Sequence, residues 1–468
     1  MRTLPGGLVV ILIGLSLCSG LWAKQAGAPA GPLSVAQIET ILKTRVGDHP
    51  GLGVIAGIID AAGTRTIVRV GSAGAGVARP LDADTVFEIG SVSKVFTATL
   101  LADMVRRGEV SLDEPVAKLL PQSVRVPSRD GREITLLSLA THTSGLPVVP
   151  SNLAPKDPEN PYADYTVELL YQFLSSYTLP RAIGEKYEYS NLGVGLLGHA
   201  LALRLGRSYE AALTERVLKP LGMKDTAVLL TPAMKARMAV GHGASGYPTE
   251  NWDLPTLAGA GAIRSTLNDM LTFLAANLGT GPADIRADLD MTHTPRHDTG
   301  TLPGQIGLAW HIRGDQAAGV VWHNGGTGGF HSFVGFDKAR RLGVVVLHNS
   351  AANIDDIGFH LLNAAVALVD TKPPARPKTE IKVDAGTIEG YVGQYAIGAA
   401  FIITISREED RLFLQATGQP RFPIFAETEN RFFLKVVDAQ ITFVKDEAGK
   451  TVALVLHQNG MDQRAVRR

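Results

Sequence analysis

Hydrophobic positions along the chain follow two patterns, which predict where strands and helices lie. Residues 51–60 and 64–71 are rich in β-branched side chains and are separated by Ala61-Ala62-Gly63, which predicts a β-hairpin. From Ser91 to Arg107 apolar residues recur at helical spacing, and Gly108 then supplies a stop, which predicts a helix. The folded part of the chain therefore begins with strands and continues into a helical region.

The same two patterns continue through the middle of the chain. Helical spacing predicts four more helices, over residues 191–205, 209–218, 266–278 and 354–369. Between the last two helices lie strand-like runs, at residues 306–312, 320–323, 330–336 and 343–348. Strands at both ends with helices between them favour one α+β domain, in which helices flank an antiparallel sheet and a helical subdomain is inserted.

The C-terminal part of the chain has a different pattern. Residues 371–378 contain three prolines and no apolar periodicity, which is typical of a linker. Short β-rich runs follow, interrupted by Gly, Asp, Glu and Asn, and this spacing predicts a small antiparallel barrel. We therefore assign residues 31–370 to the α+β domain, 371–380 to the linker and 381–468 to a small all-β domain.

The first residues have the pattern of a secretory signal peptide. A positive start at Met1-Arg2 precedes an apolar run over residues 8–17, and residues 1–23 are the predicted signal. The run is too short to span a bilayer, so we expect no stable membrane insertion. Cys18 is the only cysteine, and Leu17 before it is too large for a good lipoprotein site, so lipidation is the less favoured alternative. We expect a secreted, periplasmic protein that lacks thiols if Cys18 leaves with the signal.

Composition narrows the class of protein further. The chain has 468 residues, of which 45% are hydrophobic and 19% are charged, as in a globular protein with a large core. Lys+Arg and Asp+Glu both number 45, and this balance argues against a nucleic-acid binder, which normally carries a basic stripe. The composition by itself indicates a globular protein and no more.

One motif match is set aside. Gly193, Gly195 and Gly198 have the spacing of a dinucleotide-binding loop, but they lie within a predicted helix instead of following a strand. No acidic residue lies about 20 positions further on, where such a loop would need one. Close packing of this helix is the better interpretation.

The candidate chemistry starts at Ser91-Val92-Ser93-Lys94, at the beginning of the first long helix. Residues i and i+3 share a helix face, so Ser91 and Lys94 are expected to point into the same space. Backbone N–H groups at a helix start also favour an alkoxide and a developing oxyanion. An isolated pair of this kind is more often a helix cap followed by a solvated lysine.

Two further motifs change that balance. Tyr189-Ser190-Asn191 stands at the start of another predicted helix, and His323-Asn324-Gly325 stands at the end of a predicted strand. A tyrosine hydroxyl and an amide that converge on a serine–lysine pair can relay a proton and hold a substrate amide. Each motif is weak alone, but their order and their predicted positions together are specific.

With these motifs the sequence resembles the serine β-lactamase and penicillin-binding protein superfamily, specifically its class C branch, which carries S-x-x-K, then Y-x-N, then K-T-G or H-x-G. The surroundings agree, because residues 87–90, 112–116 and 139–147 (FEIG, LDEPV and LATHTSGLP) are similar to stretches of this branch. The resemblance covers about residues 33–370. The C-terminal domain is similar to small β-barrels that are appended to some hydrolases of this group.

The resemblance implies roles for the motif residues. Ser91 would be the acylated nucleophile and Lys94 its proton acceptor, while Tyr189 would help to protonate the leaving group and to activate the deacylating water. Whether Lys94 or Tyr189 is the general base stays open. Asn191 would bind the substrate amide, and the backbone N–H groups of Ser91 and Gly326 would form the oxyanion hole. No metal or cofactor is required.

The third motif, which would bind substrate through His323, Asn324 and Gly325, departs from the pattern of dedicated class C β-lactamases. Those enzymes normally have lysine at the position of His323 and threonine at that of Asn324, whereas H-x-G is associated with peptidases and esterases of the same fold. If His323 anchors an anionic group in its protonated form, its ordinary pKa of about 6.5 predicts that KM for carboxylate substrates rises between about pH 6 and 8.

The sequence therefore favours a serine hydrolase that forms an acyl-enzyme with an amide, a lactam or an ester. β-Lactamase-type hydrolysis and cleavage of D-amino-acid peptides are the favoured activities. We expect a monomer that acts on a small molecule or a short peptide, including peptides related to the cell wall. A carboxylesterase of the same fold is one alternative, and a catalytically silent penicillin-binding receptor is the other. The intact set of Ser91, Lys94 and Tyr189 argues against the receptor.

Overall fold

The chain buries its apolar residues in two separate cores, each within its own compact unit. The structure is a computed structural model that describes residues 33–300, 304–314, 319–371, 373, 376–398, 401–419, 421–437, 439–458 and 461–468. The expected signal peptide and Cys18 lie outside the described residues. Along the chain, the change from the larger unit to the smaller one falls within the proline-rich segment.

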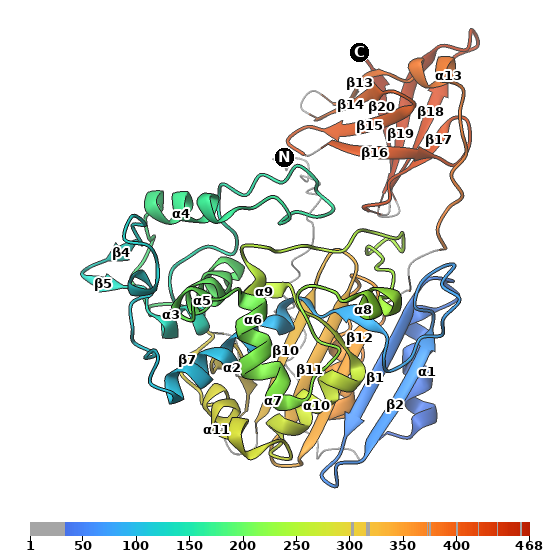
Figure 1. Cartoon of the computed structure of the whole chain (residues 1–468). Helices are drawn as coiled ribbons and strands as arrows, with labels where there is room; N and C mark the ends of the chain where they lie inside the picture. Colours follow the sequence, from blue (N-terminus) through green and yellow to red (C-terminus); the bar gives the residue numbers. More distant parts are fainter. Residues whose placement is uncertain are drawn as a thin grey trace, which may run out of the picture. The chain divides into compact units, whose positions relative to one another are not determined.

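An antiparallel sheet forms the centre of the larger unit (Figure 1). The strand order is β2-β1-β12-β11-β10-β9-β8-β7, so the N-terminal hairpin pairs directly with the last long strand of the unit. The bounds are β1 Gly53–Ile59, β2 Arg65–Gly71, β7 His297–Asp298, β8 Gly304–Ile306, β9 His311–Arg313, β10 Val320–Gly326, β11 His331–Asp337 and β12 Leu342–His348. The predicted α+β fold with an antiparallel sheet is confirmed.

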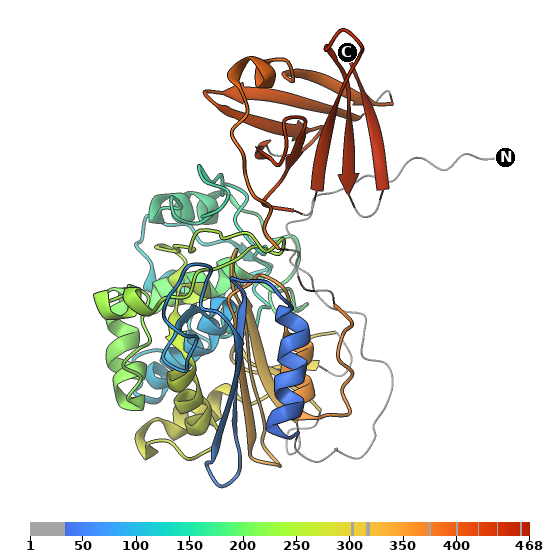
Figure 2. The same cartoon turned by 90° about the vertical axis from the view of Figure 1, so that its right-hand side faces the viewer.

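Helices cover both faces of this sheet, as Figure 2 shows. On one face α1 (Val35–Val46) packs against β1 and β2, and α12 (Asp355–Leu362) packs against β11 and β12. The other face carries α10 (Leu267–Asn277), and beyond it lies α2 (Ser93–Arg106). The remaining helices of the unit are α3 Leu136–Ala140, α4 Val167–Ser176, α5 Asn191–Arg204, α6 Tyr209–Leu213, α7 Lys219–Leu221, α8 Pro232–Arg237, α9 Ala258–Gly261 and α11 Ala283–Thr292.

Short elements connect these layers. Strand β3 (Val86–Glu88) pairs with β6 (Arg264–Thr266), and β4 (Ser128–Arg129) pairs with β5 (Arg132–Glu133). Two 3-10 turns, over Gly90–Val92 and Val116–Leu119, and a π-helical turn over Thr214–Leu218 complete the unit. Among the helices of the described residues, none is long and apolar enough to cross a bilayer.

Two predicted elements differ from those observed. The strand expected over 306–312 is split, because the Gly307 N–H donates to the Trp310 carbonyl and Ala309 adopts a positive φ of 61°. The helix expected over 354–369 ends at Leu362. Asn363 there is extended, its side chain accepts from the Ala365 N–H at 3.1 Å, and the chain turns back. Apolar spacing shows neither turn, because both depend on backbone conformation.

The smaller unit is a closed antiparallel barrel, in which each strand pairs with the next and β20 pairs back with β13 (Figure 1). The predicted all-β domain is confirmed. The β-rich runs of the sequence correspond to β14, β15, β17, β18 and β19. They miss β13, β16, which contains Pro423, and β20, whose side chains are mostly polar or exposed. The bounds are α13 Ala385–Glu389, β13 Gly393–Ile397, β14 Phe401–Glu408, β15 Arg411–Ala416, β16 Arg421–Ala426, β17 Arg431–Phe433, β18 Ala439–Lys445, β19 Thr451–Gln458 and β20 Met461–Arg467.

A short stretch from earlier in the chain belongs to the barrel unit. Residues 244–247 group with the barrel, although the residues before and after them belong to the larger unit. The ring of Tyr247 stacks on that of Phe433 with centroids 5.3 Å apart, and its hydroxyl accepts from the Lys378 N–H at 2.7 Å. The boundary between the units is therefore crossed by this loop as well as by the proline-rich segment.

Candidate active site

Ser91 lies on the 3-10 turn between β3 and α2, instead of inside the helix that the sequence predicts from this residue. The turn begins at Gly90, which has a φ of +49°, a backbone conformation that favours glycine. Ser91 is partly exposed, whereas Ser93 is fully buried and its hydroxyl accepts from the Ile263 N–H at 3.0 Å. Ser91 is thus the serine of this motif that a substrate can reach.

Lys94 directs its ammonium nitrogen toward Ser91. Nζ lies 2.8 Å from the Ser91 Oγ and donates to the Ala260 carbonyl at 2.7 Å. The Lys94 side chain is fully buried, and burial lowers its pKa well below the ordinary value of 10.5. Desolvation is the only cause of this shift, so no carboxylate offsets it. Burial thus favours the neutral, proton-accepting form of the amine.

Close packing of helices places the Ala260 carbonyl. At Gly195 a Cβ atom would lie 2.7 Å from the Leu257 side chain, and at Gly198 it would lie 3.0 Å from the Cα of Gly259. These glycines let α9 approach α5, which is the packing role that the sequence favoured over a dinucleotide loop.

Tyr189 completes the group around the serine. Its hydroxyl is close enough to the Ser91 side chain to interact with it, and the Lys94 Nζ lies 4.9 Å from the centre of its ring. Burial raises the pKa of Tyr189 above its ordinary value of 10, so the phenol keeps its proton. The next residue, Ser190, caps α5 by accepting from the Gly193 N–H at 2.8 Å. This cap fixes the position of Tyr189 relative to the start of the helix.

His142 supports Tyr189 from behind. Its Nδ1 accepts from the Ser190 N–H at 3.0 Å, and its ring centroid lies 4.5 Å from that of Tyr189. Burial, together with the nearby Lys94, lowers the pKa of His142 well below 6.5. These contacts show that His142 supports the turn before α5.

The third motif lies inside β10 and not after its end, since the strand continues to Gly326. His323 is fully buried, its Nδ1 lies 2.5 Å from the Asn324 carbonyl, and its ring lies 6.4 Å from that of Tyr189. Burial is the main cause of a pKa well below 6.5, and His311 and Lys94 lower it further. The expectation that His323 titrates between about pH 6 and 8 does not fit this environment.

Backbone atoms of the third motif press against the serine turn. A Cβ at Gly325 would lie 2.0 Å from the Ile89 carbonyl, and one at Gly90 would lie 2.7 Å from the Gly326 nitrogen. Only glycine permits this approach of two backbones. The strand end is thereby brought next to Ser91.

Asn191 and Asn324 are placed differently from one another. Asn191 begins α5, and its side chain is close enough to the Tyr162 hydroxyl to interact with it; the Tyr162 ring lies 5.6 Å from that of Trp252. Asn324 instead donates to Asp355 on α12 at 2.6 Å, so its amide is engaged on the helix side of β10. The structure thus brings Ser91, Lys94, Tyr189 and His323 together and directs the Asn324 amide elsewhere.

His311 and Tyr187 were not identified from the sequence. The Tyr187 hydroxyl and the His311 Nε2 lie 2.9 Å apart, and the His311 ring lies 5.2 Å from that of His323. Burial lowers the pKa of His311 to about 4, with a further contribution from Lys94. The imidazoles of His142, His311 and His323 are therefore neutral. None of them offers a permanent positive charge to a substrate carboxylate.

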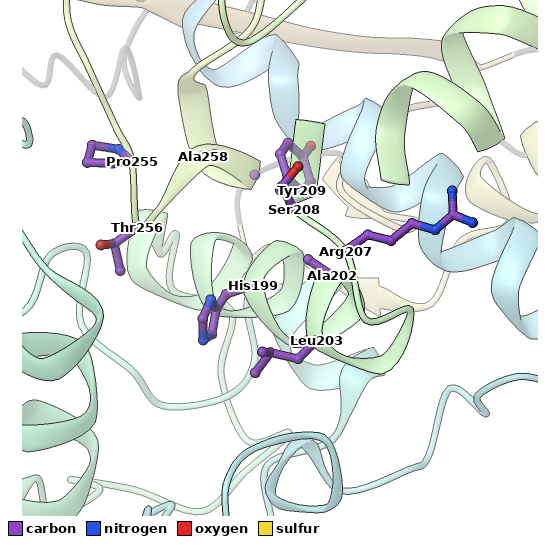
Figure 3. A pocket seen from close by; sticks show the side chains of 10 residues that line it. His199, Ala202, Leu203, Arg207, Ser208, Tyr209, Pro255, Thr256 and Ala258 are labelled. Atoms are coloured by element: carbon purple, nitrogen blue, oxygen red, sulfur yellow. The ribbon is translucent and has the colours of Figure 1, made fainter. Parts of the chain in front are cut away.

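A cavity of about 270 Å³ lies beside α9 and is separate from Ser91 (Figure 3). Its polar groups already have partners within the protein. His199 binds Tyr171 at 2.8 Å, Tyr209 binds Thr97 at 2.7 Å, and Thr256 donates to a backbone carbonyl at 2.5 Å. We assign it no ligand. The described residues also contain no group of three or more His, Cys, Asp or Glu side chains placed to hold a metal ion.

Comparison with known proteins agrees with this geometry. The Beta-lactamase family matches residues 38–368, and a domain of unknown function, DUF3471, matches residues 377–467. The D-alanyl-D-alanine-carboxypeptidase/endopeptidase AmpH of Escherichia coli strain K12 is 30% identical over 312 residues, which cover 63% of this chain and 79% of the relative. Penicillin-binding protein 4* of Bacillus subtilis strain 168 is 26% identical over 418 residues, covering 83% and 89%.

Solved structures give the same relationship. A class C beta lactamase from Rhodobacter sphaeroides superposes with a TM-score of 0.60 and 28% identity, covering 71% of this chain and 99% of that one. A beta-lactamase/D-alanine carboxypeptidase from Yersinia pestis has a TM-score of 0.60 and 25% identity, covering 71% and 99%. The chain therefore belongs to the beta-lactamase family of serine hydrolases and has class C enzymes among its relatives.

Proposed function

We propose that the protein cleaves short peptides that end in D-amino acids, through an acyl-enzyme on Ser91. The observation that carries the mechanism is the 2.8 Å contact between the Ser91 Oγ and the buried Lys94 Nζ. A neutral amine at this distance can accept the hydroxyl proton as Oγ attacks the carbonyl carbon. The C–O bond forms, and the carbonyl oxygen becomes an oxyanion that the N–H groups of Ser91 and Gly326 stabilise.

Collapse of this intermediate breaks the bond to the leaving amine. The Tyr189 hydroxyl, whose pKa is raised by burial, gives its proton to the departing nitrogen and recovers one from the Lys94 ammonium. Water then attacks the ester carbon, and its proton passes through Tyr189 to Lys94. Collapse of this second intermediate breaks the C–O bond to Ser91, so that the acid is released and Lys94 returns the proton to the Ser91 Oγ. In this scheme Lys94 is the base of acylation and Tyr189 is the relay.

The substrate preference rests on His323, which stands where dedicated class C β-lactamases normally have lysine. A lysine would offer a permanent cation to a substrate carboxylate, but the buried His323 is neutral. The 30% identity to a D-alanyl-D-alanine-carboxypeptidase/endopeptidase supports peptides as substrates. Hydrolysis of β-lactams is the second candidate, which the class C structural relatives favour.

We also propose that residues 1–23 direct export to the periplasm and that the enzyme acts as a monomer there. N-terminal sequencing of the exported protein and size-exclusion chromatography test these two points.

Intact mass spectrometry tests the proposed function directly. The protein is incubated with a penicillin, an activated ester and a peptide ending in D-alanyl-D-alanine. We expect a covalent adduct with the first two reagents and release of the terminal D-alanine from the third. Absence of any adduct with every reagent would contradict the mechanism, while an adduct without peptide cleavage would move the preference to lactams or esters.

His323 yields a prediction on pH. Because His323 stays neutral, KM for carboxylate-bearing substrates should change no more between about pH 6 and 8 than KM for neutral esters. His323→Lys should lower KM for penicillins about tenfold, as expected for one added interaction of about 1.4 kcal/mol. Steady-state kinetics on a charged and a neutral substrate check both statements. A steep rise of KM for the charged substrate alone would show that His323 is protonated in this range.

Removal of the barrel gives a second prediction. A chain that ends near residue 371 should still be acylated at Ser91, because the catalytic groups all lie in the larger unit. The truncation removes Phe433, so Tyr247 loses its stacking partner. We therefore expect that the Tyr247→Ser version of the truncated chain is the more soluble of the two. Acylation stoichiometry checks the result, and loss of folding in both versions would show that the larger unit depends on the barrel.

A further inference from the structure

Asp355, the first residue of α12, connects two strands near the candidate site. Its Oδ2 accepts from the Asn324 Nδ2 at 2.6 Å and from the Asn353 Nδ2 at 3.1 Å. Its Oδ1 lies 2.9 Å from the His331 Nε2. A carboxylate can only accept hydrogen bonds, so this histidine nitrogen carries the proton. The side chains of Asp355 and His331 are only 15% and 10% exposed, so little solvent competes for these contacts.

The two strands held in this way form one hairpin. Asn324 is on β10, and His331 on β11 lies directly opposite Gly326, with which it pairs. The turn between them is closed by the Thr327 N–H, which donates to the Phe330 carbonyl at 3.0 Å. A single carboxylate therefore binds both strands next to the turn.

The same hairpin end contacts the serine turn. The Ser332 hydroxyl donates to the Ile89 carbonyl at 2.8 Å. Gly325 packs against the Ile89 carbonyl and Gly90 packs against the Gly326 backbone, with no room for a Cβ at Gly325 or Gly90. A shift of the hairpin would therefore move the Gly326 N–H relative to Ser91. Displacements well below 1 Å are enough to weaken an oxyanion donor.

We propose that Asp355 is a positioning residue that fixes the Gly326 N–H as the second oxyanion donor. This inference rests on the proposed function. Its hydrogen bonds to Asn324 and His331 involve a charged acceptor and are correspondingly strong. Asn324 would thus act through Asp355 instead of contacting substrate, which explains why its amide faces α12.

Asp355→Asn tests the proposal, with Asp356→Asn as the matched control. The carboxamide keeps only one of the two acceptor oxygens, so it would present its own N–H either to His331 or to Asn324 and Asn353. Asp356 is the next residue, is also buried, and binds Arg45 at 2.5 Å and the Val369 N–H at 2.8 Å. The Asp356→Asn variant therefore measures the effect of losing a buried carboxylate at the same helix end without changing the contacts of Asp355.

The measurements are kcat and KM for an activated ester, and the affinity for phenylboronic acid, whose tetrahedral adduct with Ser91 places an oxygen in the oxyanion hole. Asp355→Asn should lower kcat about 10- to 100-fold with KM nearly unchanged, because an oxyanion donor acts mainly in the transition state. Boronate affinity should fall by a similar factor. In Asp356→Asn both quantities should stay within about twofold for the folded enzyme.

A second variant keeps the test decisive if Asp355→Asn does not fold. Asn324→Ala removes one hydrogen-bond donor to Asp355 and should lower kcat about three- to tenfold without raising KM. If both single variants fold, adding Asn324→Ala to Asp355→Asn should cost little more, since both act through one contact. A loss seen mainly in KM, or boronate affinity equal to that of the wild type, would overturn the proposal. Failure of the wild-type protein to form any Ser91 adduct would instead refute the proposed function.

Discussion

Replacing Ser91 by alanine should lower kcat by a factor on the order of 10⁶, as expected when the nucleophile of a covalent mechanism is removed. Fold and stability should change little. The turn that holds Ser91 and the following helix α2 have no side-chain cap bond, so the hydroxyl does not stabilise the helix start. Its contacts are with Lys94 and Tyr189, both of which belong to the proposed reaction.

Ser93→Ala is the matched control, because Ser93 is two residues away and fully buried. Its hydroxyl accepts from the Ile263 N–H at 3.0 Å, so its loss should cost stability, about 1 kcal/mol, and leave kcat within a few-fold. Peptide mapping after labelling with a fluorescent penicillin or a phosphonate should find the label on Ser91 alone. A label on Ser93 or Ser144 would refute the assignment of the nucleophile.

The sequence predicts the central part of this site because its signal is local. Ser91 and Lys94 are three positions apart, and the chain that follows them has a clear helix pattern, so their proximity can be expected without a structure. Tyr189 follows for a related reason, since Ser190 marks the start of α5 as a capping residue. The sheet, the inserted helices and the barrel likewise follow from apolar periodicity.

Other features depend on contacts between distant segments, which periodicity does not contain. His311 on β9 contacts Tyr187, which lies far earlier in the chain. Asp355 on α12 accepts a hydrogen bond from Asn324 on β10. The turn within 306–312 depends on a positive φ at Ala309, a residue that gives no turn signal. The neutral state of His323 also follows from burial, which a lone histidine in a sequence does not reveal.

Lys94→Met should abolish activity and at the same time stabilise the folded protein. The fully buried Lys94 has no carboxylate partner, and desolvation lowers its pKa well below 10.5. Folding at neutral pH must therefore remove a proton that the unfolded chain keeps, which costs free energy. Methionine has a similar length and no such cost, although it leaves the Ala260 carbonyl without the Lys94 donor. We expect a net gain in unfolding free energy of about 1–2 kcal/mol near pH 7.

The pH dependence distinguishes this explanation from better packing of methionine. Between the lowered pKa in the folded state and about 10.4 in the unfolded state, the unfolded chain binds more protons, so the stability of the wild type rises with pH. Lys94→Met lacks this contribution, and its advantage over the wild type should therefore shrink from pH 7 to pH 9. Urea unfolding of both proteins at each pH measures the difference, and Lys224→Met, at an exposed position, controls for the loss of one lysine. A constant advantage across this range would show that Lys94 is not neutral in the folded protein, and the same result would remove the basis for its role as the proton acceptor.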